Sequence, residues 1–154
     1  MNFFGHAALA ASHFSERQPP LAVGLLPTVC LGAMLPDFLG MLRVTRPTIR
    51  DAALATGVVF HHGTDEVFHE LPGFQRLSRQ AFAWLTQQHM PRGPARAVAH
   101  MGIEMLLDEV MADDASARDA YRSALQVPLA PLLDTSPADS ERLASLQQAL
   151  LTRS

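Results

Sequence analysis

The sequence predicts an all-α fold built as a single domain. Its composition favours helix over sheet, because aromatic residues make up only 6% and the helix formers Ala, Leu, Met, Arg and Gln are frequent. Apolar residues recur at helical spacing along most of the chain, and no stretch alternates apolar and polar residues as a strand would. With 154 residues, 48% of them hydrophobic, the chain is long enough for one core. We therefore expect residues 1–154 to form one domain of about six to seven helices.

The first half of the chain should contain three helical segments. Residues 2–14 have helical spacing and end before a polar loop closed by prolines. Residues 21–42 are almost wholly apolar, and we expect Pro36 to interrupt this stretch and to begin a new helical turn. A short basic connection then leads to a helix over residues 49–70, which the following Leu-Pro-Gly sequence should stop.

The second half should add further helices separated by turns. Residues 74–89 are amphipathic, and the turn rich in Pro and Gly after them precedes a helix over residues 95–111. Asp113 and Asp114 favour the start of another helix, because carboxylates stabilise a helix N-terminus. A last helix over residues 138–152 follows two proline-containing breaks and is expected to lie on the surface as a strap.

Charge, cysteine content and hydropathy restrict the class of protein. The formal net charge is −3, which gives no sign of a nucleic-acid-binding surface. Cys30 is the only cysteine, which excludes an internal disulfide and fits a reducing compartment, and the first residues lack the basic segment of a secretory signal. Residues 21–42 are apolar enough to consider as a membrane span, but their prolines and Asp37 favour a buried helix pair. We expect a cytoplasmic protein without a membrane span.

The densest group of potential metal ligands lies in the helix expected over residues 49–70. His61, Asp65 and His69 are each four residues apart, so they lie along one side of that helix. Imidazole nitrogens and carboxylate oxygens one turn apart can bind the same divalent cation. The alternative is a set of intrahelical His–carboxylate contacts, each worth about a few tenths of a kcal/mol. Three apolar residues precede His61, and an unpaired carboxylate is costly in an apolar interior, so we favour the cation.

Two histidines of this segment have other expected places. His62 cannot share the side of His61, and we expect it in a substrate pocket or on the surface. His69 lies near the helix end, where it is a ligand, a general acid facing a phosphate, or a favourable cation at the helix C-terminus.

A second row with the same spacing is formed by His100, Glu104 and Asp108. Its helix is apolar nearly all round, which is typical of a buried helix. Three titratable groups on a buried helix need partners, and one cation would satisfy them together. We predict His100 and Asp108 as metal ligands and assign Glu104, with His69, to catalysis. Two such rows facing each other would form a hydrolytic metal centre.

Two isolated residues complete this set. His6 lies one turn into the apolar first helix, where the alternative to a ligand is a core histidine with satisfied hydrogen bonds. Asp37 follows Pro36 in a long apolar run, where it either caps a helix or gives a cation a hard oxygen ligand.

Four motifs, in this order along the chain, resemble the acyl carrier protein phosphodiesterase family. They lie at residues 1–6, 32–37, 57–65 with the following Leu71-Pro72, and 103–108. The family has a short Asn-Phe-Leu-Ala-His start, a Gly-to-Asp segment, a His-x-x-x-Asp helix ahead of a proline and a later carboxylate helix. Its fold is related to the helical HD-type metal phosphohydrolases. The resemblance spans residues 1–111 and implies an HD-like domain whose metal centre contains His6, Asp37, His61, Asp65 and Asp108.

Two positions depart from the family pattern. His62 and Gly63 follow His61 where the family has an arginine, and Asp108 is followed by Glu109 where the family has a histidine. Contacts with the substrate can therefore differ while the metal site is kept.

The resemblance implies hydrolysis of the phosphodiester that joins phosphopantetheine to a serine of acyl carrier protein, the expected partner. A hard divalent cation would polarise the phosphoryl oxygen, and mixed nitrogen and oxygen ligation favours Mn, Fe or Mg over structural Zn. His62, Arg43 and Arg46 are the expected substrate contacts, since guanidinium groups bind phosphate well. Two alternatives stay open: a metal-dependent hydrolase of another phosphate ester, such as a phospholipid or nucleotide, and a non-catalytic helical protein with structural His/Asp pairs.

Overall fold

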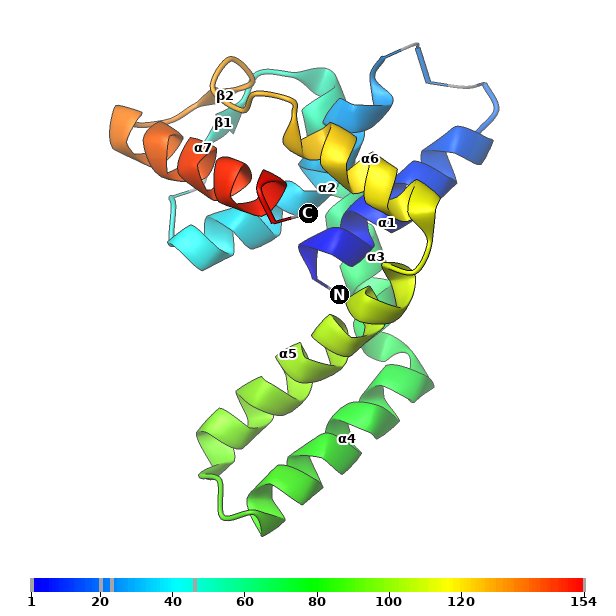
Figure 1. Ribbon diagram of the computed structural model, residues 1–154, viewed down its shortest axis with the longest axis vertical. Coiled ribbons are helices and arrows are strands. Elements are labelled where there is room, and N and C mark those ends of the chain that lie inside the picture. Colours follow the sequence, from blue (N-terminus) through cyan, green and yellow to red (C-terminus); the bar gives the residue numbers. More distant parts are fainter. Residues whose placement is uncertain (1, 20, 23, 46, 154) are drawn as a thin grey trace.

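A computed structural model describes residues 2–19, 21–22, 24–45 and 47–153. Within these residues the chain forms seven α-helices and one pair of two-residue strands (Figure 1). The elements are α1 (Phe3–Glu16), α2 (Leu26–Leu42), β1 (Thr48–Ile49), α3 (Ala52–Glu70), α4 (Pro72–Gln87), α5 (Arg92–Met111), α6 (Ala115–Leu125), β2 (Leu133–Asp134) and α7 (Pro137–Leu151). The all-α prediction is confirmed.

Side-chain caps determine where several of these helices begin. Asn2, Asp51, Asp114 and Ser136 each accept a hydrogen bond from a backbone N–H group in the first turn of the helix that follows. The helix expected from residue 49 therefore starts after Asp51. Thr48 and Ile49 instead form β1, which pairs antiparallel with β2, a short pairing that the sequence did not indicate.

The expected break at Pro36 is wrong, because α2 continues through it to Leu42. Pro36 cannot donate the N–H that would bond the carbonyl of Gly32, yet the helix persists there. The reason is burial: α2 contacts α1, α3, α6 and α7, and Leu31, Met34 and Phe38 are fully buried. Tertiary packing thus outweighs the local preference.

Two glycines allow α2 and α3 to approach closely. A Cβ atom on Gly32 would lie 2.1 Å from the Leu54 carbonyl oxygen, and one on Gly57 would lie 2.0 Å from the Val29 carbonyl oxygen. Neither position could hold a side chain without separating the helices. This contact holds α3 beside Ala33 of α2, whose carbonyl oxygen lies 2.8 Å from His61 Nδ1.

Helices α4 and α5 form an antiparallel hairpin that projects from the other helices (Figure 1), and we call it the α4–α5 arm. The expectation that α5 is buried nearly all round is wrong. Four apolar side chains of α5 are more than half exposed: Met101 (58%), Met105 (59%), Leu106 (58%) and Val110 (70%). The reason is that α5 packs mainly against α4 and α1, which leaves its other sides uncovered. No helix in the described ranges is long and apolar enough to cross a membrane.

Candidate metal centre

Three helices bring His6, Asp37 and His61 together in what we call the inner group. One potential ligand atom from each residue lies within 4.8 Å of the other two. His6 is fully buried and His61 is 6% exposed, and their ring centroids are 3.9 Å apart. The sequence prediction that these residues share a site therefore has the required proximity.

Hydrogen bonds orient both imidazoles of the inner group. His61 Nδ1 lies 2.8 Å from the Ala33 carbonyl oxygen, which can only accept, so Nδ1 carries the proton and Nε2 keeps a lone pair. The Thr64 hydroxyl donates to the Phe60 carbonyl and can accept from His6 Nδ1 at 3.3 Å. This contact is compatible with a lone pair on His6 Nε2. His61 thus has the tautomer that a metal ligand requires, and the Thr64 contact allows the same tautomer in His6.

Asp37 contributes a carboxylate oxygen that the described residues leave without a hydrogen bond. Its Oδ2 atom is buried and finds no hydrogen-bond partner among the described residues. Burial is the main reason that the pKa of Asp37 is raised to about 7; the positive charge of the N-terminus acts against this shift, and the nearby carboxylates of Asp65, Glu104 and Asp108 add to it. Burial also lowers the pKa of His61, which favours its neutral, ligating form. A cation at this point would offset the crowded negative charge.

A second set of potential ligands, the outer group, consists of His69 on α3 with His100 and Glu104 on α5. His69 Nε2 and His100 Nε2 lie 3.2 and 3.1 Å from the same carboxylate oxygen, Oε1 of Glu104. Asp65 lies between the two groups. Its Oδ1 atom is 3.6 Å from His6 Nε2, and its Oδ2 atom is 3.5 Å from His69 Nδ1.

The two predicted rows of ligands do not face each other to form a single site. His61 belongs to the inner group and His69 to the outer group, because a four-residue step turns a helix by about 40° beyond a full circle. The two ends of the row therefore meet different helices. Asp108 belongs to neither group, since its Oδ1 atom accepts the Gly5 N–H at 3.2 Å and so caps the start of α1. This contact differs from the ligand role predicted for it.

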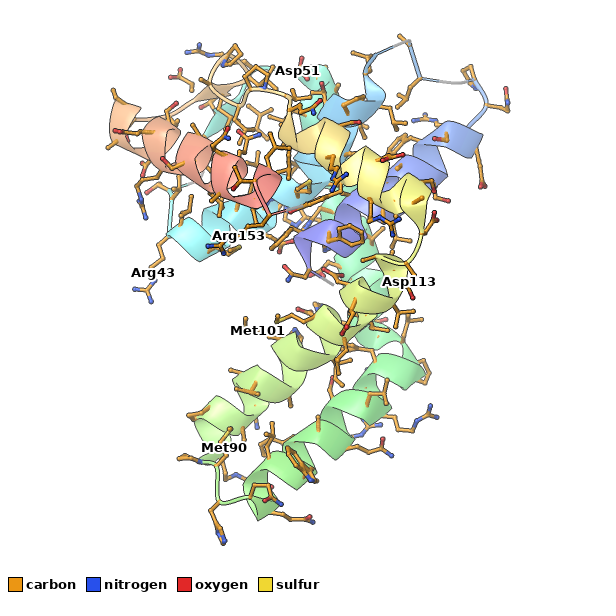
Figure 2. The ribbon with its side chains drawn as sticks, viewed as in Figure 1. Arg43, Asp51, Met90, Met101, Asp113 and Arg153 are labelled. Atoms are coloured by element: carbon orange, nitrogen blue, oxygen red, sulfur yellow. The ribbon has the colours of Figure 1, made fainter. Side chains whose placement is uncertain are left out.

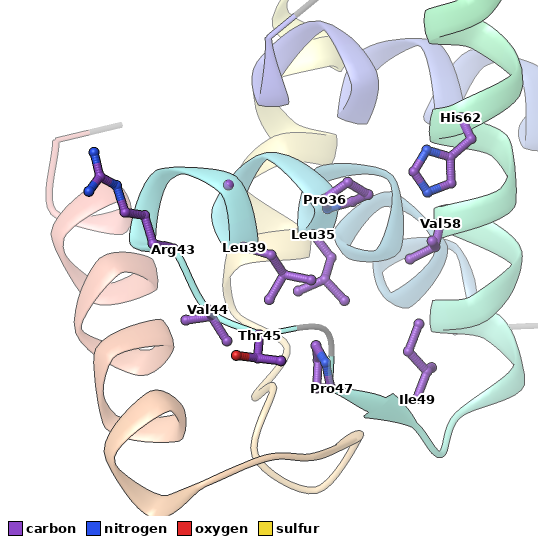
Figure 3. A pocket seen from close by; sticks show the side chains of 11 residues that line it. Leu35, Pro36, Leu39, Arg43, Val44, Thr45, Pro47, Ile49, Val58 and His62 are labelled. Carbon is purple, nitrogen blue, oxygen red and sulfur yellow. The ribbon is translucent and has the colours of Figure 1, made fainter.

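The predicted substrate residues His62 and Arg43 line one pocket between α2 and α3 (Figure 3). The pocket has a volume of about 650 Å³ and mainly apolar walls, which include Leu35, Leu39 and Val58. The Arg43 guanidinium extends from the end of α2 away from the other lining side chains (Figure 3). Arg46, the third predicted contact, lies outside the described residues.

A smaller pocket of about 270 Å³ connects the two groups. Asp37 of the inner group and Glu104 of the outer group both line it, and Met41, Met101 and Met105 supply apolar walls. Met101 extends from α5 on the side away from α4 (Figure 2). Pro36 and Gly40 line both this pocket and the larger one, so the two pockets are neighbours.

Sequence reasoning missed the residues that position the ligands. Thr64, the Ala33 carbonyl and the Gly32–Gly57 contact all act through other residues. The signal that was present is the pair of glycines inside helices, since a helical glycine without a turn to make often marks close packing.

No protein-family model matches this chain, and neither a curated protein nor a solved structure matches it. Its function must therefore be inferred from the geometry of the two groups and from the sequence motifs.

Proposed function

We propose that this chain is a metal-dependent phosphodiesterase with an HD-like helical fold. The main support for the proposal is the close approach of His6, Asp37 and His61, which lie on three different helices. Both histidines are buried. Two imidazoles and a carboxylate form a suitable ligand set for first-row divalent cations, and Mn, Fe or Mg are the expected ions.

The inner group fits a cation better than it fits structural His–Asp pairing. A structural role would leave Asp37 with a buried oxygen that no described residue bonds and with neighbouring carboxylates that repel its charge. A divalent cation removes both costs. This comparison favours a metal centre over a non-catalytic helical protein.

The residues around the inner group can perform the remaining tasks of a hydrolase. A divalent cation held there would polarise a phosphoryl oxygen and lower the pKa of a water molecule. His6 and His61 present their Nε2 atoms, and their Nδ1 protons are held by Thr64 and Ala33. His62, which lines the larger pocket, would receive an anionic group of the substrate, and the Arg43 guanidinium, which extends away from the other lining side chains (Figure 3), would contact the carrier.

The proposed substrate is the diester between phosphopantetheine and the serine of an acyl carrier protein. The order of the motifs over residues 1–111 supports it, and the larger pocket has the size of a small-molecule site. The apolar walls of that pocket favour one alternative, a phosphate ester with an apolar chain such as a phospholipid.

Mass spectrometry of holo acyl carrier protein tests the proposal. After removal of metal with EDTA and addition of Mn²⁺, the enzyme should release phosphopantetheine, and the carrier should lose the corresponding mass. His61→Gln should abolish this activity, whereas His13→Gln, an exposed histidine on α1, should keep it. Activity on a generic diester without loss of phosphopantetheine would favour the alternative substrate. Failure to hydrolyse any diester with Mn²⁺, Fe²⁺ or Mg²⁺ would refute the enzymatic proposal.

A further inference from the structure

The proposed function requires one cation, in the inner group, and leaves the outer group without a role. We propose that His69, His100 and Glu104 form a separate site for a second divalent cation, with Asp65 orienting His69 from behind. This assignment gives His69 and Glu104 the role of ligands in place of the catalytic role expected from the sequence.

The three ligand atoms are arranged around one point. His69 Nε2 and His100 Nε2 both face Glu104 Oε1, at 3.2 and 3.1 Å, and the two imidazole centroids are 4.8 Å apart. Two histidines and one carboxylate are a known ligand set of open metal sites, which leave further positions to water or substrate. The group joins α3 to α5, so it connects the arm to the helices that hold the inner group.

Asp65 supports this assignment through the other nitrogen of His69. Its Oδ2 atom faces His69 Nδ1 at 3.5 Å, so with a cation on Nε2 the ring proton would lie on Nδ1 and face this carboxylate. A carboxylate behind a ligating histidine fixes its orientation and raises its basicity. Because Asp65 Oδ1 faces His6 Nε2, one carboxylate contacts a histidine of each group.

A metal-free ion-pair network explains this geometry less well. A neutral His69 has one N–H group but faces carboxylate oxygens with both nitrogens, so one of the two contacts would set a lone pair against a carboxylate. Only a doubly protonated His69 would satisfy both without a cation. The side chains of His69 and His100 are 34% and 45% exposed, and ion pairs with that exposure contribute little to stability. These ion pairs therefore contribute little to the stability of the fold.

The two groups also share a pocket. Glu104 and Asp37 both line the cavity of about 270 Å³, so an anionic group bound in this cavity would lie beside both sites. The second site therefore adds positive charge where a phosphate ester would bind.

Zinc titration of the metal-free protein by calorimetry, with elemental analysis of the loaded protein, tests this inference. The wild-type protein should bind two zinc ions, whereas His100→Ala and His61→Gln should each bind one. In the His61→Gln protein, adding Asp65→Asn should weaken binding of the remaining ion by about 10–100-fold. His13→Ala, which removes an exposed histidine outside both groups, should still bind two.

Binding of a single zinc ion by the wild type, or of two by His100→Ala, would overturn the second site. His100 is partly exposed, so circular dichroism and the unfolding midpoint in EDTA should match the wild type; if His100→Ala did not fold, Glu104→Gln would carry the same test. Stoichiometry is independent of hydrolysis. Two bound ions without phosphodiesterase activity would refute the proposed function alone, and activity with one bound ion would refute the second site alone.

Discussion

Replacing Asp37 by asparagine should stabilise the metal-free protein and, at the same time, remove most of its response to cations. Burial and nearby carboxylates raise the pKa of Asp37 from 3.8 to about 7 in the folded protein. Between these values the folded state binds more protons than the unfolded chain, so the stability of the wild type falls as the pH rises. Three pKa units correspond to roughly 4 kcal/mol, lost fully above about pH 7. Asparagine has no such titration.

Urea unfolding followed by circular dichroism in EDTA measures this effect. Asp37→Asn should exceed the wild type in unfolding free energy by up to about 4 kcal/mol near pH 8, and by roughly 2–3 kcal/mol less near pH 5. Asp108, whose pKa burial raises to about 6, titrates in the same direction in both proteins, so the comparison removes most of its contribution. Asp119→Asn, an exposed change on α6, should show no such trend.

Cations should narrow the difference in unfolding free energy between the two proteins. Saturation at 100 times the dissociation constant stabilises a binding protein by about 2.7 kcal/mol, and Asp37→Asn should gain much less. A variant less stable than the wild type near pH 8 in EDTA, or a difference that does not change with pH, would refute the account of Asp37 as a destabilised ligand.

Three further changes probe the surroundings of the site. Gly57→Ala should lower the unfolding free energy by about 1–3 kcal/mol or more, because its Cβ would overlap α2, whereas Gly63→Ala on the same helix meets no atom within 4 Å and should be tolerated in the same urea titration. Cys30 is 1% exposed and burial raises its pKa to about 12, so thiol reagents should modify it only after unfolding; modification of the native protein would contradict its buried position. His62→Ala should raise the KM for the diester and leave calorimetric cation affinity unchanged, and a lost cation would show that His62 is a ligand.

Helix boundaries were predictable wherever a local signal sets them. Asp114 caps α6 where acidic residues predicted a start, and α3 ends where Leu-Pro-Gly predicted a stop. The predicted break at Pro36 was wrong because the effect of a proline depends on the packing around α2, which no local sequence pattern contains. The exposure of α5 misled for a similar reason, since its apolar surface lies on a projecting arm rather than in the core.

At the candidate site, too, the sequence predicted what depends on one helix and not what depends on contacts between helices. Spacing along α3 was enough to select His61 and His69, which belong to one group each, and Asp65, which contacts a histidine of each group. It could not tell which helix each one meets, because helical periodicity gives the side of a helix and not its partner. Asp108 has suitable spacing, yet its carboxylate accepts a hydrogen bond from a backbone N–H of α1 and belongs to neither group of ligands.

The length of the arm would amplify any tilt at its base. Glu104 lies near its base, and the twelve residues from Glu104 back to Arg92 correspond to about 18 Å of helix. Tilting the base by about 10° would displace the far end by roughly 3 Å over that length. The sequence between Glu70 and Glu104 carries four arginines and no acidic residue, so the displaced surface is positively charged. The contacts between α3 and α5 at the base of the arm would therefore determine the direction in which this charge faces the solvent.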